Sequence, residues 1–408
     1  MSVLGGIIIA IVIAIAHGNS KWNTLDWLEA HNVSYELHNV TTGDGYQLQV
    51  QRLPRLGARP VLLVHGLLGS SLSWLCQGPG KSLAFQLYQQ HYDVWLANQR
   101  GSSPYGRHHL ELTDVMAEFW HYSFHEFGSY DLAAIIDHMT EITSKSSSSA
   151  EEEMHEDEEE KANAEVVEPH QVLLIGHSQA FNAFLVLCAM HPRFNQRILL
   201  IQALAPLAQL HRQVRFDSTQ VRAVMKFVKQ RQKSNKFELF QPGELRKICQ
   251  KKREQCEYYT KQLVGSSQNN KKLLDAFNYD NLLQGGSIRE IKHLQQIWKS
   301  GDFIAYDYGP IENLQVYHNI EALGYNLSDI SVPIILYFGQ TDAIATPEGV
   351  HAIYAKMLNS VRSVRRIASN KFNHLDFLLS SDVKTLVNDK LIELMEKFLE
   401  GKLPYIIE

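Results

Sequence analysis

The fold of this chain is decided by one stretch, Val172-Leu-Leu-Ile-Gly-His-Ser-Gln-Ala180. Its first four residues are apolar without alternation, which is typical of a parallel strand buried on both faces. An apolar run of helical length, residues 181–190, follows directly. Ser178 therefore lies in a tight strand-to-helix turn, with its hydroxyl at the carboxyl end of the strand and a helix N-terminus beside it. A serine in an ordinary turn is the alternative, but the strand before and the helix after it favour a nucleophile.

Other buried strands surround this one and alternate with helical stretches. Largely apolar runs occur at residues 60–64, 92–96, 197–203 and 333–338, and a weaker one at 364–369. The helical stretches 82–90 and 130–143 separate the early strands, which predicts a parallel sheet. Residues 33–53 alternate around a Gly-rich turn and predict an antiparallel hairpin. An amphipathic helix is expected at 383–403.

One segment of about a hundred residues has a different pattern. Residues 208–309 are rich in Lys, Arg and Gln at helical periodicity, and no run among them resembles a buried strand. We expect a helical cap or lid there, inserted between two parts of one core, residues 17–207 and 310–408. The predicted fold class is α/β, with a mostly parallel central sheet, helices on both faces and this inserted cap.

Residues 144–170 form a serine-rich and then acidic stretch. Eight carboxylates lie within residues 151–160 and account for more than the formal net charge of −5 over 408 residues. Such a composition buries too little apolar surface to fold, so we expect a disordered insertion. It joins a helix to a strand, which places it at the amino edge of the sheet, opposite the catalytic edge. Nothing in the charge pattern indicates nucleic acid as a partner.

The N-terminus has the pattern of a secretory signal. Residues 3–16 are apolar and end in Ala14-Ile-Ala16, small residues at the positions that a signal peptidase reads. We expect a signal peptide at residues 1–16. An uncleaved anchor is the alternative, because a basic n-region is missing, although a stable membrane span needs about twenty apolar residues. The expected localisation is secreted or lysosomal.

Asparagine sequons and cysteines agree with that compartment. Asn32, Asn39 and Asn326 each begin an Asn-x-Ser/Thr motif, which is used only in the secretory pathway. Of four cysteines, Cys249 and Cys256 are the pair that we expect to form a disulfide. We expect no metal site, since these cysteines have no accompanying histidine pair of zinc-ligand spacing.

Two partners are needed to activate a serine, a base and an acid that orients it. Asp342 follows the apolar run 333–338, and His374 follows the last weak run. Both therefore lie at the carboxyl edge of the sheet, in the chain order Ser, Asp, His. We interpret Ser178, Asp342 and His374 as a catalytic triad. Asp376 is a rival for the acid.

Acyl transfer also needs two donors for the tetrahedral oxyanion. The segment His65-Gly66 leaves the first long parallel strand, where this arrangement supplies one backbone N–H group. The residue after the nucleophile supplies the other. We assign Leu67 and Gln179 as the donors through their main chains. No cofactor is needed for this chemistry.

Several longer stretches strengthen this interpretation. They are Thr42-Gly-Asp-Gly-Tyr46, His65-Gly-Leu-Leu68, Tyr92-Asp-Val-Trp-Leu96, Asn98, Arg100-Gly101, Phe119-Trp120, Ser123-Phe124, Tyr130-Asp-Leu132, Gly176-His-Ser-Gln179, Ala203-Leu-Ala-Pro206, Tyr306-Asp-Tyr-Gly309 and Asn373-His-Leu-Asp-Phe377. On these, nearly the whole mature chain resembles the animal acid lipase family, which has the α/β-hydrolase fold. The resemblance implies hydrolysis of triacylglycerols or steryl esters at a lipid–water interface, at acid pH, with no cofactor and a lid within the cap.

Departures from the family pattern leave two other functions open. Ala180 replaces the elbow glycine, Ala97 replaces a glycine before Asn98, and residues 283–287 read Leu-Gln-Gly-Gly-Ser where the family usually reads Pro-Ala-Gly-Thr-Ser. The alternatives are a short-chain carboxylesterase and a secreted lipid-binding homologue with low turnover. The retained triad argues for an enzyme.

Overall fold

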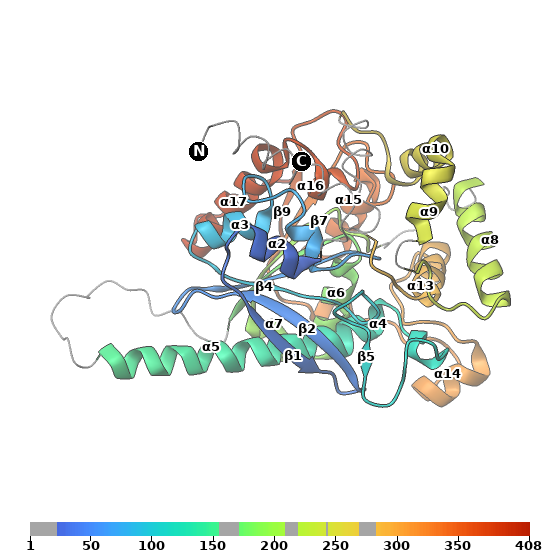
Figure 1. Ribbon diagram of the computed structural model, residues 1–408, viewed down its shortest axis with the longest axis horizontal. Helices are drawn as coiled ribbons and strands as arrows, with labels where there is room; N and C mark the ends of the chain where they lie inside the picture. Colours follow the sequence, from blue (N-terminus) through green and yellow to red (C-terminus); the bar gives the residue numbers. More distant parts are fainter. Residues whose placement is uncertain (1–22, 155–170, 209–218, 242–243, 269–282) are drawn as a thin grey trace, which may run out of the picture.

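The computed structural model describes residues 23–154, 171–208, 219–241, 244–268 and 283–408 (Figure 1). The expected signal peptide, residues 1–16, lies outside this part of the chain. A nine-stranded sheet runs through the centre in the order β1-β2-β4-β3-β6-β7-β8-β9, with β5 paired to β2. The strands are β1 (Glu36–Thr41), β2 (Tyr46–Leu53), β3 (Pro60–Val64), β4 (Asp93–Leu96), β5 (His108–His109), β6 (Val172–His177), β7 (Ile198–Leu204), β8 (Ile334–Phe338) and β9 (Val361–Arg366).

The pairing is parallel through the middle of the sheet and antiparallel at one edge. β4, β3, β6, β7, β8 and β9 are parallel neighbours, whereas β1 and β2 form an antiparallel hairpin whose second strand pairs with β4. The predicted hairpin and the mostly parallel sheet are therefore confirmed. Because parallel strands point the same way, the loops that follow β6, β8 and β9 meet at one edge of the sheet.

Helices cover both faces because alternate residues of each buried strand point to opposite sides. In β3, Val61 and Leu63 pack with one hydrophobic cluster, whereas Leu62 and Val64 pack with another. The first cluster includes α3 (Leu83–Gln89) and α17 (Asp389–Leu399). The second includes α5 (Ala133–Met154), α6 (Ala180–Met190) and α15 (Pro347–Lys356). Both faces of the sheet are buried, as continuous apolar strands require.

Two predicted element boundaries are wrong. The last strand is β9 (Val361–Arg366), three residues earlier than the expected 364–369. Its sequence alternates buried valine and serine with arginine, so the apolar signal is weak and its register is set by pairing with β8. The C-terminal helix is a π-helical turn, Lys384–Asn388, followed by α17, which ends at Leu399.

The acidic insertion begins later than expected. We predicted disorder from residue 144, but α5 continues to Met154, so that part of the prediction is wrong. Ala, Glu and Met between residues 150 and 154 have high helix propensity, and each added residue of an existing helix gains a hydrogen bond without new nucleation. Residues 155–170 lie outside the described part. In Figure 1 the end of α5 points away from α8, α9 and α10, toward the opposite side of the molecule.

The expected cap contains helices with a small core of their own. They are α8 (Thr219–Lys233), α9 (Glu244–Lys251), α10 (Arg253–Val264) and α13 (Ile288–Ser300), and α14 (Pro310–Tyr317) follows (Figure 1). Met225, Val228, Leu239 and Ile288 form a hydrophobic cluster among these elements. We keep the name cap for residues 208–309.

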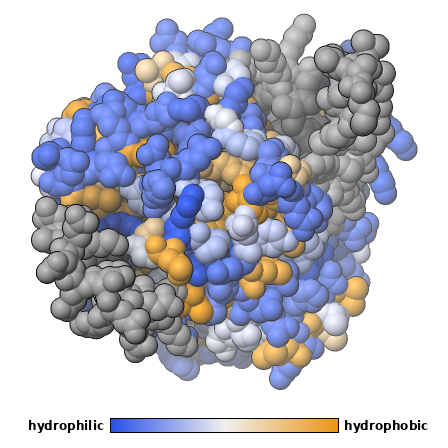
Figure 2. All heavy atoms as spheres, turned by 60° about the vertical axis from the view of Figure 1, so that its left-hand side comes forward, coloured by the Kyte–Doolittle hydropathy of each residue, from blue (hydrophilic) through white to orange (hydrophobic). Residues whose placement is uncertain are grey.

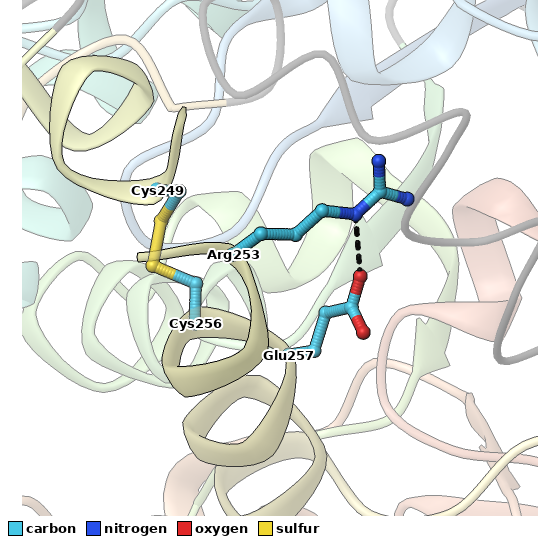
Figure 3. Close-up of a disulfide and its surroundings, with 4 residues drawn as sticks. All are labelled: Cys249, Arg253, Cys256 and Glu257. Carbon is cyan, nitrogen blue, oxygen red and sulfur yellow. Dashed lines mark hydrogen bonds and ion pairs between the residues drawn. A yellow bond between two sulfur atoms is a disulfide. The ribbon is translucent and has the colours of Figure 1, made fainter. Parts of the chain in front are cut away.

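A covalent bond joins two of the cap helices. The structure links Cys249 of α9 to Cys256 of α10 by a disulfide with a Cα–Cα distance of 5.5 Å (Figure 3). At the start of α10, Arg253 Nε donates to Glu257 Oε1 at 2.8 Å on the exposed side of the helix. The break at Lys252, between α9 and α10, leaves the two Cα atoms within the usual bonding range.

The surface is mixed in character. On the face shown in Figure 2, hydrophilic residues dominate and apolar residues occur in small separate groups. Scattered apolar side chains of this kind are normal on folded proteins. Within the described residues, no helix combines the length and apolar character needed to cross a bilayer.

Candidate active site

Ser178 occupies a strained turn directly after β6. Its φ of +58° lies in the left-handed region, which a residue with a side chain adopts only under tertiary constraint. Its N–H donates to the carbonyl of Leu204 at 2.9 Å, which ties the turn to the end of β7. The strand therefore ends abruptly, and α6 begins at Ala180. This is the geometry of a nucleophile elbow.

Small residues on both sides make the turn possible. A Cβ atom on Gly176 would lie 2.8 Å from Cβ of Ala180 and 2.6 Å from Cε2 of Phe184, so glycine is required there. The methyl group of Ala180 is fully buried in this contact. The departure from the family glycine is thus accommodated by Gly176. Likewise, a Cβ on Gly66 would lie only 3.0 Å from Cβ of Ser178. Because glycine has no Cβ, the loop after β3 can approach the elbow closely.

The three residues of the expected triad lie in contact. His374 Nε2 is 2.8 Å from Ser178 Oγ, and His374 Nδ1 is 2.9 Å from Asp342 Oδ2. All three are at least 95 % buried. The other carboxylate oxygen of Asp342, Oδ1, accepts hydrogen bonds from the backbone N–H groups of Ile344 and Ala345, each at 2.8 Å. With Nδ1–H donating to Asp342, Nε2 is left as the acceptor for the serine proton.

Asp376, the rival acid, has a different role in the structure. Its Oδ1 accepts from Ser267 Oγ at 2.7 Å, and its Oδ2 accepts from the N–H of Asn373 at 2.7 Å. Burial raises the pKa of Asp376 to about 6 against the effect of these donors. Asp376 therefore holds the loop that carries His374, whereas Asp342 contacts the imidazole.

A segment from the end of α10 passes between the two loops that carry Asp342 and His374. We call residues 264–268 the strap. The Val264 carbonyl accepts from the N–H of His374 at 3.1 Å and from that of Ala343 at 3.4 Å. The Gly265 carbonyl accepts from Asn373 Nδ2 at 3.1 Å. The strap thus joins the cap to both loops, and our sequence interpretation missed it because no local motif announces the contact.

The strap requires glycine. Gly265 has φ +96° and ψ −179°, a conformation that is essentially restricted to glycine. A Cβ atom there would lie 1.8 Å from the carbonyl oxygen of Thr341. Thr341 Oγ1 in turn donates to the carbonyl of Ser266 at 2.5 Å.

His177, the residue before Ser178, supports the loop that carries His374. Its ring Nε2 is 2.9 Å from the carbonyl oxygen of His374, and the rings of His177 and His374 lie with centroids 4.7 Å apart. Burial holds the pKa of His177 well below its usual range. His177 is therefore neutral and donates from Nε2 to the loop.

The two assigned oxyanion donors lie on either side of the elbow. Gln179 begins the first turn of α6, and Leu67 follows Gly66 in the loop after β3. Within the described residues, neither backbone N–H donates to a protein acceptor. His65 braces the loop: its Nδ1–H donates to the Gly66 carbonyl at 2.8 Å, and its Nε2 accepts from the N–H of Gln99 at 3.1 Å. Burial lowers the pKa of His65 to about 4, so the ring is neutral.

A carboxylate from the cap contacts this region, and our sequence interpretation missed it. Glu290 of α13 is 1 % exposed and accepts from Gln179 Nε2 at 2.6 Å and from Gln99 Nε2 at 3.1 Å. The sequence around Glu290 indicates only a capping box. Ser287 caps α13, and Glu290 Oε2 accepts a hydrogen bond from the Ser287 N–H at 2.8 Å.

The sequon asparagines Asn32, Asn39 and Asn326 are all exposed. Each side chain is therefore accessible from solvent, as attachment of a glycan requires.

Comparisons with known proteins agree with the fold. A family model described as "alpha/beta hydrolase fold" matches residues 59–380, and one described as "Partial alpha/beta-hydrolase lipase region" matches residues 24–78. Lipase 1 of Drosophila melanogaster is 33% identical over 90% of this chain and 78% of its own length. Gastric triacylglycerol lipase of Bos taurus is 30% identical over 88% of this chain and 87% of its own length. A solved esterase from Exiguobacterium antarcticum superposes with a TM-score of 0.53 at 12% identity, covering 88% of this chain and 98% of the esterase.

Proposed function

The chain belongs to the α/β-hydrolase fold family and, within it, to the animal acid lipases, and from this premise we propose how it acts and on what. It is a carboxylic ester hydrolase. Its proposed substrates are long-chain esters of lipids, triacylglycerols or steryl esters, and its proposed mechanism proceeds through a covalent acyl-enzyme on Ser178. The observation that carries the mechanism is the contact of His374 Nε2 with Ser178 Oγ at 2.8 Å, with Asp342 against the other ring nitrogen at 2.9 Å.

Acylation begins with proton transfer. His374 Nε2 takes the proton of Ser178 Oγ as the oxygen attacks the ester carbonyl, and a tetrahedral oxyanion forms. Asp342 keeps the proton of the neutral imidazole on Nδ1 and stabilises the imidazolium. The same imidazolium then donates its Nε2 proton to the leaving alkoxide. Water repeats the sequence on the acyl-enzyme, with His374 again as the base.

The N–H groups of Leu67 and Gln179 are the proposed donors to the oxyanion. Support comes from their place on two loops that Gly66 allows to approach closely, and from the absence of a protein acceptor for either group within the described residues. Fixed donors of this kind typically contribute about 3 to 4 kcal/mol each to transition-state stabilisation.

The proposed setting is the secretory pathway, with delivery to the lysosome or the cell exterior, and the proposed working pH is acidic. The sequence pattern of residues 1–16 and the three exposed sequons support the first point. The resemblance to the acid lipases supports the acidic working pH. The buried carboxyls Glu290 and Asp376 also support it, because the pKa of each is raised in the folded protein, to about 7 and about 6.

The test is hydrolysis by the purified mature protein and by Ser178→Ala. We expect hydrolysis of triolein or cholesteryl oleate emulsions at pH 5, and a loss of at least about a thousandfold in kcat for the variant with its fold retained. Activity confined to soluble short-chain esters would favour the short-chain carboxylesterase. Equal rates for the two proteins would exclude Ser178 as the nucleophile.

A further inference from the structure

Glu290 links the cap to both loops that carry the proposed oxyanion donors. Its Oε1 accepts from the side chain of Gln179, the residue after the nucleophile. The same oxygen accepts from the side chain of Gln99, whose backbone N–H donates to the ring of His65, two residues before Leu67. One carboxyl group on α13 therefore contacts Gln179 directly and contacts the loop of Leu67 through Gln99 and His65.

In the part of the chain that the structure describes, this carboxyl group has no cationic partner. Within the described residues its hydrogen-bond partners are the two glutamine amides and the N–H of Ser287. A buried carboxylate held only by neutral donors is poorly stabilised, because three dipoles replace bulk water and no opposite charge is present. Burial accordingly raises the pKa of Glu290 to about 7 despite these donors.

The cluster also offers acceptors for a protonated carboxyl. Oε1 of Gln179 and Oε1 of Gln99 are both buried and have no hydrogen-bond partner in the described residues. A half-turn of the Gln179 amide would place its oxygen at the present position of Nε2, 2.6 Å from Glu290 Oε1. That distance is in the normal range for O–H···O and shorter than the usual N–H···O distance. The cluster can therefore satisfy Glu290 with or without its proton.

The histidine and tyrosine side chains near Glu290 do not gain or lose a proton between about pH 5 and pH 8. His65 from the loop after β3 and His293 of α13 are neutral, since burial lowers their pKa to about 4 and about 3. Tyr122 lies within the electrostatic reach of Glu290, and burial raises the pKa of Tyr122 well above its ordinary value. Glu126, the last residue of α4 (Phe124–Glu126), adds a repulsive charge that favours the protonated form of Glu290.

One further charged pair lies next to the segment that precedes α13. Arg107 donates to Glu238, so each offsets the charge of the other beside Gly285. Neither residue contacts the Gln179 amide.

We propose that Glu290 is a positioning residue that holds Gln179 from the cap, and that the enzyme is active when this carboxyl is neutral and is slowed when it ionises. This rests on the proposed function, in which negative charge develops at the N–H of Gln179. A carboxylate one side chain away from that N–H repels the oxyanion, and the low dielectric of a buried site strengthens the repulsion. Glu290 thus gives this chain a built-in preference for acid pH.

The test is the pH profile of kcat and KM on the soluble ester p-nitrophenyl butyrate between pH 4.5 and 8.5. We expect kcat of the wild type to fall about tenfold on the alkaline side, with KM little changed, because the repulsion acts on the transition state. Glu290→Gln keeps the shape of the neutral carboxyl and should remove this decline. Glu290→Asp retains a titrating group one methylene farther away, so the decline should return with a shifted midpoint.

Glu244→Gln is the matched control, because it removes another cap carboxyl, one that accepts from Arg231 and does not touch Gln179. We expect its alkaline decline to match the wild type. A Glu290→Gln profile with the wild-type decline would overturn the proposal. If that variant does not fold, Glu290→Asp decides, and an unchanged midpoint would count against Glu290. Ser178→Ala is assayed in parallel: if it stays active, the proposed function itself fails, whatever Glu290 does.

Discussion

Gly265→Ala probes how the strap supports the catalytic loops. The new Cβ would lie 1.8 Å from the carbonyl oxygen of Thr341, whereas contacts under 3.0 Å are essentially never found, so the backbone must move by more than about 1 Å. That movement disturbs the hydrogen bonds that the Val264 carbonyl accepts from His374 and Ala343, at 3.1 and 3.4 Å. A displacement of about 1 Å at catalytic groups reduces rates by roughly a hundredfold.

Stability should fall as well. Placing alanine in this glycine-only backbone conformation costs about 1–3 kcal/mol, and each weakened hydrogen bond adds about 1 kcal/mol. We therefore expect a loss of about 3–5 kcal/mol in the free energy of unfolding, with kcat on p-nitrophenyl butyrate reduced by about ten- to a hundredfold. Equilibrium denaturation in urea and steady-state kinetics at 25 °C measure the two effects separately.

Gly309→Ala is a matched control. Gly309 has φ +91° and ψ 161°, close to the conformation of Gly265, but its Cβ would have no neighbour within 4 Å. It should therefore show the backbone strain alone, a loss of about 1–3 kcal/mol with kcat within about twofold of the wild type. If Gly265→Ala also keeps kcat within twofold of the wild type, the strap does not position the catalytic loops and the reasoning is refuted.

Three further predictions concern the acid, the disulfide and pH. Asp342→Asn should lower kcat by about a thousandfold or more because it disturbs the tautomer of the base, while Asp376→Asn should mainly lower stability; a larger kcat loss for Asp376→Asn would reverse the assignment. Replacing Cys249 and Cys256 together by serine should lower the free energy of unfolding by about 2–3 kcal/mol, measured by thermal denaturation, and an unchanged midpoint would contradict this. The folded-state pKa values of Glu290 and Asp376, about 7 and about 6, exceed their ordinary values, so the folded protein binds more protons and stability should decrease as pH rises from about 4 to about 7. Thermal midpoints recorded across that range check the sign, and a rise in the midpoint would show that other groups dominate.

Much of the fold was predictable because its signals are local. A strand buried on both faces must be apolar throughout, and residues 172–175 meet that condition before the structure is known. The glycine, histidine and serine that follow mark the elbow. Once the strands are taken as parallel, their shared direction puts Ser178, Asp342 and His374 at one edge. The prediction failed where the local signal was weak, at β9, or mixed, at the end of α5.

What the sequence by itself determined, then, is the α/β class, the edge of the sheet at which chemistry would occur, and the residue types for acyl transfer. Only the tertiary structure decided which carboxylate faces the imidazole. Asp342 and Asp376 are the same residue type, but Asp342 contacts His374 whereas Asp376 accepts from Ser267. The tertiary structure also decided that Gly265 and Glu290 belong to the site. Their contacts, to Asn373 and Gln179, join segments more than 100 residues apart. Side-chain periodicity carries no information about such pairs, because it reports which face of an element is buried but not what lies against it.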